Sequence, residues 1–165
     1  MTEGVQAVAS GAGREGTRME STGRIVDSQE LKWNLIESGE AHPAQHATHH
    51  KIPNEALRDH SLAQEAMARG DYDPDRAENG EFLPESKTVK EAAHSELPFH
   101  CGGHPNYNRL ALVEGNSIES KLIDRYGSLD AVPDAVLGKA MSEWEHRMDV
   151  HVHDAKNWTD DGRLK

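Results

Sequence analysis

The sequence predicts an α+β protein, mostly helical, that folds as a single domain around a small irregular centre of loops and short strands. Two stretches in the C-terminal half carry apolar residues at helical spacing over several turns, which is typical of long amphipathic helices. The segments before them are short and interrupted by Gly and Pro, which favours loops and short strands. A length of 165 residues suits one ordinary domain with its own core and is short for two.

The composition excludes several classes of protein. The 29 acidic residues outnumber the 18 basic ones, and a net charge of −11 argues against a protein that holds nucleic acid mainly through a broad basic face. No run approaches the roughly 20 apolar residues of a membrane-spanning helix, and the N-terminus lacks the layout of a signal peptide. One cysteine excludes an intrachain disulfide framework and a four-cysteine zinc site. The unusual feature is the eleven histidines.

The first part of the chain differs in character from the rest. Residues 1–30 are expected to be a flexible leader or linker, because their glycines are scattered among Ser, Thr and charged residues without an apolar period. A compact apolar cluster begins at Leu31, and we expect the folded domain to span residues 31–160. Trp33 and Trp144 are expected in its core.

The remaining elements follow in chain order. We expect a helix over residues 54–69, a very short strand at 82–84, a loop with one helical turn at 85–95, an irregular segment at 97–105, and helices over 106–126 and 133–153. Pro53 and Gly70 bound the first helix, and Gly127 ends the second. Gly115, inside the second helix, is expected to mark a kink.

Two pairs of histidines have a spacing that suits a metal site. His100 and His104 lie four residues apart on a tight loop that enters a helix, so both rings can point at one ion. His49 and His50 are adjacent on an extended segment, where neighbouring side chains point to opposite sides. One ring can then ligate a metal while the other faces a substrate or a water, as metal-assisted hydrolysis requires. Either pair by itself is more typical of solvated surface histidines than of a metal site.

The combination of motifs is more specific than either pair. Three motifs occur in order: a His-His pair at 49–50 followed by Ile-Pro, the segment Glu78-Asn-Gly-x-Phe-Leu-Pro84, and His100-x-x-x-His104-Pro-x-Tyr-Asn at the start of a helix. Together they resemble the nuclease toxin domains of the HNH/endonuclease VII superfamily, in the AHH branch of bacterial polymorphic toxins. The resemblance covers roughly residues 41–125 and implies a ββα-metal (His-Me finger) core with one divalent ion. Thr48 stands where the branch name implies Ala, and Lys51 follows the pair where an apolar residue is usual.

The resemblance also implies a role for each matching residue. His49 would be the strand ligand to the metal, and His50 would be the general base. Asn79 would orient the His50 ring through its other nitrogen or shape the turn beside it. His100 and His104 would complete the metal site. Three imidazoles leave an open position for water or phosphate and favour zinc, with nickel, manganese and magnesium as alternatives.

The function that the resemblance implies is a metal-dependent endonuclease that hydrolyses phosphodiester bonds, with DNA favoured over RNA. It would act as an antibacterial effector or toxin domain, with a cognate immunity protein as a partner and no membrane partner. A larger effector or a secretion apparatus, such as a type VI system, would deliver it without a signal peptide to the target-cell cytoplasm. The candidate cations for a phosphate path are Arg58, Lys87, Lys90 and Arg109.

Other classes of function remain open at the level of sequence. In a non-catalytic module, the histidines would hold a structural zinc and the helices would bind a protein partner. Such a site would be closed by a fourth ligand, for which Cys101, His46 or a carboxylate is available. An inactive relative or acidic binding protein suits the net charge but leaves the series of motifs unexplained.

Overall fold

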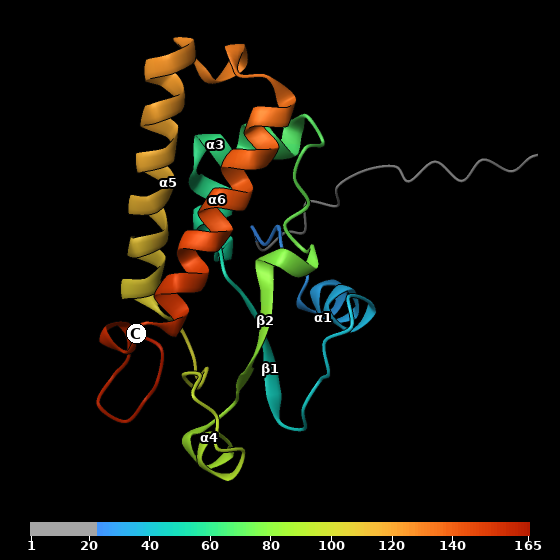
Figure 1. The fold of residues 1–165 in the computed structure, drawn as a ribbon, viewed down its shortest axis with the longest axis vertical. Coiled ribbons are helices and arrows are strands. Elements are labelled where there is room, and N and C mark those ends of the chain that lie inside the picture. The colour runs from blue at the N-terminus through green and yellow to red at the C-terminus, as the bar shows by residue number, and fades with distance from the viewer. Residues whose placement is uncertain (1–22) are drawn as a thin grey trace, which may run out of the picture.

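The structure is a computed structural model that describes residues 23–165 (Figure 1). Its elements, in chain order, are α1 (Ser28–Glu37), β1 (His46–His50), α2 (Asn54–Asp59), α3 (Ser61–Ala68), the 3-10 turn η1 (Ala77–Asn79), β2 (Gly80–Pro84), α4 (Lys87–Ala92), α5 (Pro105–Tyr126), η2 (Leu129–Ala131), α6 (Asp134–His153) and η3 (Ala155–Asn157). The predicted class is confirmed, since the fold is mostly helical around one antiparallel hairpin. Among these helices, none has the length and apolar character needed to cross a membrane.

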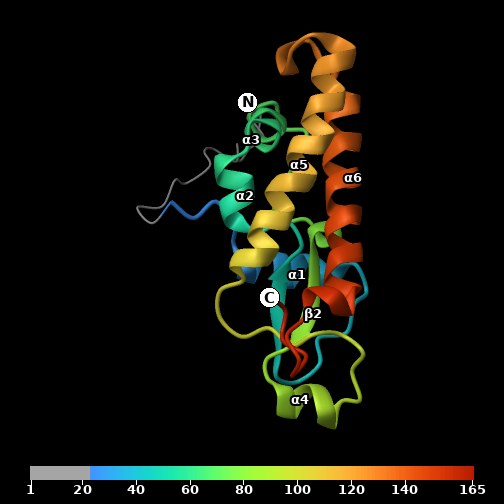
Figure 2. The same ribbon diagram turned by 90° about the vertical axis from the view of Figure 1, so that its left-hand side faces the viewer.

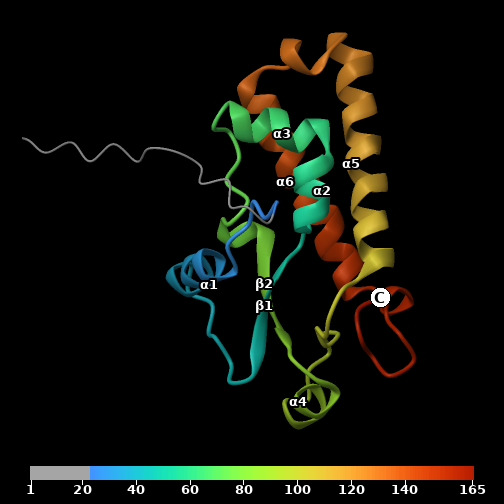
Figure 3. The same ribbon diagram turned by 180° about the vertical axis from the view of Figure 1, so that it is seen from behind.

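The hairpin of β1 and β2 separates two sides of the molecule. Its register pairs His49 with Glu81, and His50 lies opposite Gly80. Residues directly opposite in an antiparallel pair share a face, so these two pairs lie on opposite faces of the hairpin. Helix α1 lies on one side and α5 and α6 on the other (Figures 1 and 3). Gly80 permits the close approach of α1, because a Cβ there would meet the Leu31 side chain at 2.5 Å.

Helices α5 and α6 lie side by side and form the main core with α2 and α3 (Figure 2). Trp144 of α6 is fully buried, and its indole N–H donates to the carbonyl of Ala111 at 3.0 Å. A Cβ at Gly115 would meet the Trp144 ring at 2.5 Å. Helix α5 runs without a break through Gly115, which lies against the Trp144 ring of α6, and the kink expected there stays a prediction. Because Gly115 has no side chain, the Trp144 indole fits against the helix at this point.

A smaller cluster holds α1 against the hairpin. Leu31 and Leu35 are fully buried and pack with Phe82 of β2. Because residues four apart share a helix face, this arrangement turns Trp33 outward. Trp33 is 54% exposed, so its predicted core position is wrong, whereas the prediction for Trp144 is confirmed.

The helix expected over residues 54–69 is divided into α2 and α3 at His60. The backbone of His60 is extended, and its Nδ1 accepts a hydrogen bond from the Leu62 N–H at 3.2 Å, which caps α3. Its Nε2 lies 3.1 Å from Oδ1 of Asn116 on α5. Histidine is not among the usual helix caps, so nothing in the sequence marks this break.

The chain outside the main elements is also held to the core. Val26 is buried, and the Ile25 N–H donates to Oδ1 of Asn54 at 2.8 Å. Near the other end, Leu164 is fully buried. Residues 1–22 of the predicted leader lie outside the described residues. The proposed boundaries, 1–30 for the leader and 31–160 for the domain, remain predictions.

Candidate metal centre and active site

Three of the four predicted histidines gather beside the hairpin, and we call His49, His100 and His104 the histidine cluster. His49 comes from β1, His100 from the irregular segment after α4, and His104 immediately precedes the first residue of α5. The ring centres of His100 and His104 lie 4.7 Å apart. That of His49 lies 5.2 Å from His100 and 6.2 Å from His104. All three rings line one open cleft of about 550 Å³.

Two ring nitrogens in the histidine cluster have no partner. Nε2 of His49 and Nε2 of His104 are both buried and form no hydrogen bond. Buried side-chain nitrogens nearly always have a partner, so a pair of unpartnered ones facing a polar cleft calls for a ligand. Burial lowers the pKa of His49 well below its usual value, and burial with the nearby His104 lowers the pKa of His100 to about 4. The rings are therefore neutral at pH 7, the form that binds metal ions.

The spacing of the rings fits one metal ion after a small adjustment. Three imidazoles bound to one zinc ion lie about 5.2 Å apart, centre to centre, for Zn–N bonds of about 2.0–2.1 Å and tetrahedral angles. The observed separations of 4.7, 5.2 and 6.2 Å bracket that value. The ring nitrogens of the histidine cluster are not all within 4.8 Å of one another. Within residues 23–165, that condition is met by a different trio, Glu81, Asp149 and His153. The rings of His49 and His104 would thus have to approach by about 1 Å to share a tetrahedral ion.

The C-terminal segment orients one ring of the histidine cluster. Nδ1 of His104 lies 2.9 Å from the carbonyl oxygen of Leu164. A carbonyl can only accept, so Nδ1 carries the proton and Nε2 is left as the free nitrogen. Leu164 is itself held by its N–H, which donates to the Phe99 carbonyl at 3.2 Å. Nothing in the sequence motifs pointed to this contact.

His50 is held by a carboxylate that sequence reasoning missed. Its Nε2 lies 2.8 Å from Oδ1 of Asp75, and both side chains are largely buried. An ionised carboxylate can only accept, so Nε2 donates and Nδ1 is the ring nitrogen free to take a proton. The same Asp75 oxygen accepts from the Asp27 N–H at 2.8 Å, which anchors the carboxylate to the start of α1. His50 also lines the cleft of the histidine cluster.

Asn79 acts on the loop rather than on the His50 ring. Its Oδ1 accepts from the Ile52 N–H at 2.9 Å, and its Nδ2 donates to the Pro74 carbonyl at 2.8 Å. Asn79 is fully buried and so ties the segment before Asp75 to the residues that follow β1. Of the two roles that the resemblance implied, this geometry corresponds to shaping the turn.

The other candidate residues lie in different settings. Arg58 lines the cleft together with Arg24. Lys90 instead donates to the carbonyls of Ser95 and Leu97. Cys101 is exposed, and Nδ1 of His46 lies 3.0 Å from the carbonyl of Ala44.

Comparison with known proteins adds one finding to this geometry. The model of a family described as a nuclease family of the HNH/ENDO VII superfamily with conserved AHH matches residues 32–125, more than half of the chain. The matched span includes the histidine cluster, His50, Asp75 and Asn79. No curated protein and no solved structure matches the chain.

Proposed function

The chain belongs to the AHH nuclease family of the HNH/ENDO VII superfamily, and on this premise we propose that it is a zinc-dependent endonuclease that cuts DNA. Family membership makes the protein a phosphodiester hydrolase with a ββα-metal core that uses a divalent metal and acts on nucleic acid. The proposed mechanism rests on one observation: the metal donors and the candidate base line the same cleft. The unpartnered nitrogens of the histidine cluster and the carboxylate-held ring of His50 both line it.

The histidine cluster supplies the donors for the metal. Nitrogen donors favour zinc or another late first-row ion over magnesium or calcium, which prefer oxygen ligands. When bound, the ion polarises the scissile phosphate and stabilises the negative charge on the leaving oxygen. The neutral state of the three rings, caused by burial, keeps the donors available at pH 7.

His50 acts as the general base. Its Nδ1 accepts a proton from the attacking water, and the ring becomes positively charged. Asp75, 2.8 Å from Nε2, holds the ring in the required tautomer and stabilises this charge. Asn79 positions the loop that carries Asp75 and does not contact the ring.

The chain has a net charge of −11, so its overall field repels nucleic acid. The substrate is therefore bound through a few cations close to the site. Arg24 and Arg58 line the cleft beside the histidines. The Arg58 guanidinium is paired with Asp59 on the surface, and an exposed pair of this kind is weak enough to exchange its partner for a phosphate. Among the described lining residues, the large aromatic is Tyr107, which is buried and offers no platform for unpaired bases. This supports a duplex held by its backbone rather than an unpaired strand, and DNA is the duplex that we propose.

The same proposal includes a role as the toxin domain of an antibacterial effector. Its support is the resemblance of the motifs to nuclease toxin domains. A producing cell then requires an immunity protein, for which a basic surface would complement the acidic chain. A larger effector or a secretion apparatus would carry the domain to the cytoplasm of the target cell.

Induced expression in a bacterial cytoplasm should stop growth for the wild type but not for His50→Ala. Equal growth of both would contradict this role.

A structural-zinc module is the alternative function, and it requires a fourth protein ligand. The histidine cluster opens onto a cleft, and Cys101 is exposed. Plasmid DNA and a folded RNA, each incubated with the EDTA-stripped and the zinc-loaded protein, separate these functions. The nuclease predicts cutting that zinc restores, with DNA cut faster than RNA. Tight zinc binding without cutting of either substrate would favour the structural module.

A further inference from the structure

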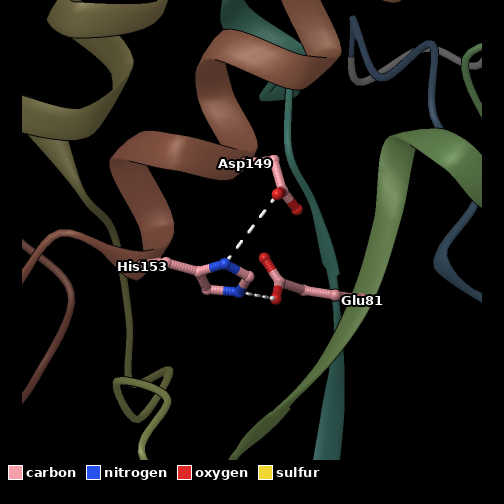
Figure 4. A group of neighbouring side chains, drawn as sticks. All are labelled: Glu81, Asp149 and His153. Carbon is pink, nitrogen blue, oxygen red and sulfur yellow. Dashed lines mark hydrogen bonds and ion pairs between the residues drawn. The ribbon is translucent and has the colours of Figure 1, made fainter.

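A second group of metal-ligand side chains lines a different cleft, which shares no lining residue with the cleft of the histidine cluster. Glu81 of β2 and Asp149 and His153 of α6 converge there (Figure 4), and one ligand atom from each lies within 4.8 Å of the others. Nε2 of His153 lies 3.2 Å from Oε2 of Glu81, and its Nδ1 lies 3.8 Å from Oδ2 of Asp149. The residues come from elements that are far apart in sequence, so the fold assembles the group.

The Glu81 carboxylate carries an oxygen that nothing in the described protein satisfies. Glu81 is 8% exposed, and its Oε1 is buried without a hydrogen-bond partner. Figure 4 shows this second oxygen facing the carboxylate of Asp149, away from the ring of His153. A buried carboxylate oxygen that faces another carboxylate is costly unless a cation or a proton lies between them.

The ion pairs around this group do not satisfy the Glu81 oxygen that faces Asp149. Lys51 Nζ lies 2.8 Å from Oδ1 of Asp149, so it satisfies the oxygen of that carboxylate other than the one nearest His153. His153 satisfies one oxygen of Glu81. Glu81 therefore retains an oxygen without a partner, whereas Oδ2 of Asp149 has the ion pair with His153 at 3.8 Å, which is too long for a hydrogen bond.

We propose that Glu81, Asp149 and His153 bind a second divalent transition-metal ion, separate from the metal of the histidine cluster. Two carboxylates and one imidazole suit manganese or zinc, because oxygen donors accept the harder ion and the imidazole suits both. The group borders its own cleft of about 580 Å³, which leaves room for water to complete the coordination. This proposal does not rest on the nuclease function.

The position of the site suggests what the ion does. The Tyr107 hydroxyl donates to the Lys51 carbonyl at 2.7 Å, and its ring centre lies 5.4 Å from that of His49. Tyr107 lines the cleft of the histidine cluster, and the lining residues of that cleft do not occur in the cleft beside Glu81. A bound ion would tie β2 to the C-terminal turn of α6 and so fix the strand that pairs with His49. It stabilises the hairpin and takes no part in the chemistry.

Calorimetric titration of the EDTA-stripped full chain with Zn²⁺ tests the proposal. The wild type should bind two ions, whereas Glu81→Gln and His153→Ala should each bind one ion or bind the second at least about tenfold more weakly, since loss of even an outer-shell partner costs about 10–100-fold. Glu81→Gln preserves shape, and the His153 side chain is 46% exposed, so both variants should fold. His146→Ala, at an exposed position on the same helix, is the matched control and should still bind two.

A second experiment, in the His100→Ala variant, separates the two sites. This variant should lose the ion of the histidine cluster and keep the ion bound by Glu81, Asp149 and His153, so its melting temperature should rise when Mn²⁺ is added. The double variant His100→Ala/Glu81→Gln should show no such rise. One ion per wild-type chain, with Zn²⁺ binding unchanged by Glu81→Gln and His153→Ala, would overturn the proposal whether or not the protein cuts DNA. In that case a proton alone would join the carboxylates.

Discussion

Nδ1 of His104 lies 2.9 Å from the backbone carbonyl oxygen of Leu164, 60 residues further along the chain. This contact makes the C-terminal segment part of the metal centre, because it fixes which nitrogen of His104 is free to bind. The segment also contributes to the core, since Leu164 is fully buried. Its packing and its carbonyl group can be tested separately.

Removal of residues 161–165 should weaken zinc binding about 10–100-fold, because it deletes the carbonyl that orients His104. Leu164→Ala is the matched variant, since it keeps the backbone carbonyl and loses the buried side chain. It should lower the free energy of unfolding by about 2–5 kcal/mol while binding zinc within a few-fold of the wild type. Calorimetry and urea denaturation measure the two effects. Unchanged zinc affinity in the truncated chain would refute the role of the carbonyl.

Asp75→Asn should reduce the rate of DNA cleavage by about 10²–10⁴-fold while the protein stays folded and binds metal. The amide cannot stabilise a charged His50 ring, and its NH₂ group favours the wrong tautomer. Glu78→Gln removes the same charge from an exposed position three residues further along the chain and should leave the rate within a few-fold. Cleavage rates with saturating zinc provide the comparison. Equal rates for Asp75→Asn and wild type would mean that Asp75 has no part in the reaction.

The metal-free protein should lose stability as the pH falls from about 6.5 towards 4. Burial lowers the pKa of His49, His100 and His104 in the folded state, and that of His100 falls to about 4. The unfolded chain then binds more protons than the folded one, so the stability is fully present above pH 6.5 and is lost below it. Urea denaturation between these pH values should show a shallower loss for His100→Ala than for wild type. Identical slopes would contradict the prediction.

Two glycine substitutions in the long helices should change the free energy of unfolding in opposite directions. Gly115→Ala should lower the free energy of unfolding by about 1–3 kcal/mol, because its Cβ would meet the buried Trp144 ring at 2.5 Å. Gly138→Ala, on α6, should raise it by about 0.5–1 kcal/mol, since the nearest atom, the Asp71 carbonyl oxygen, is 3.8 Å from its Cβ. Thermal unfolding of both variants provides the measurement. A stabilised Gly115→Ala protein would show that α5 and α6 are not packed as closely as described.

Local sequence signals predicted the long elements well. The helices expected over residues 106–126 and 133–153 are confirmed as α5 and α6 within one residue at each start, because their apolar spacing and end signals agree with their packing. Trp33 failed as a core prediction because large apolar residues indicate burial only when they share a face with their neighbours. The break at His60 was missed because a histidine cap depends on contacts with another helix.

The partners of the site residues could not be predicted from spacing. His50 meets Asp75 across 25 positions, and His104 meets Leu164 across 60. Both contacts depend on how the loop and the C-terminal segment return to the hairpin, which no local pattern encodes. The motifs suggested the histidines themselves, and their roles as ligands and base remain predictions. The group of Glu81, Asp149 and His153 was likewise not recognised, because Glu81 and the two α6 residues lie far apart in the sequence.

The most direct test of the proposed mechanism compares plasmid cleavage by wild type and His50→Ala, with the zinc content of each protein measured in the same samples. The His50 ring lies beside the histidine cluster but is held by Asp75, so its removal should leave the metal donors in place. We predict that His50→Ala retains zinc and that its cleavage rate falls by about 10²–10⁴-fold. A zinc-loaded His50→Ala protein that cuts at the wild-type rate would contradict the assignment of His50 as the general base.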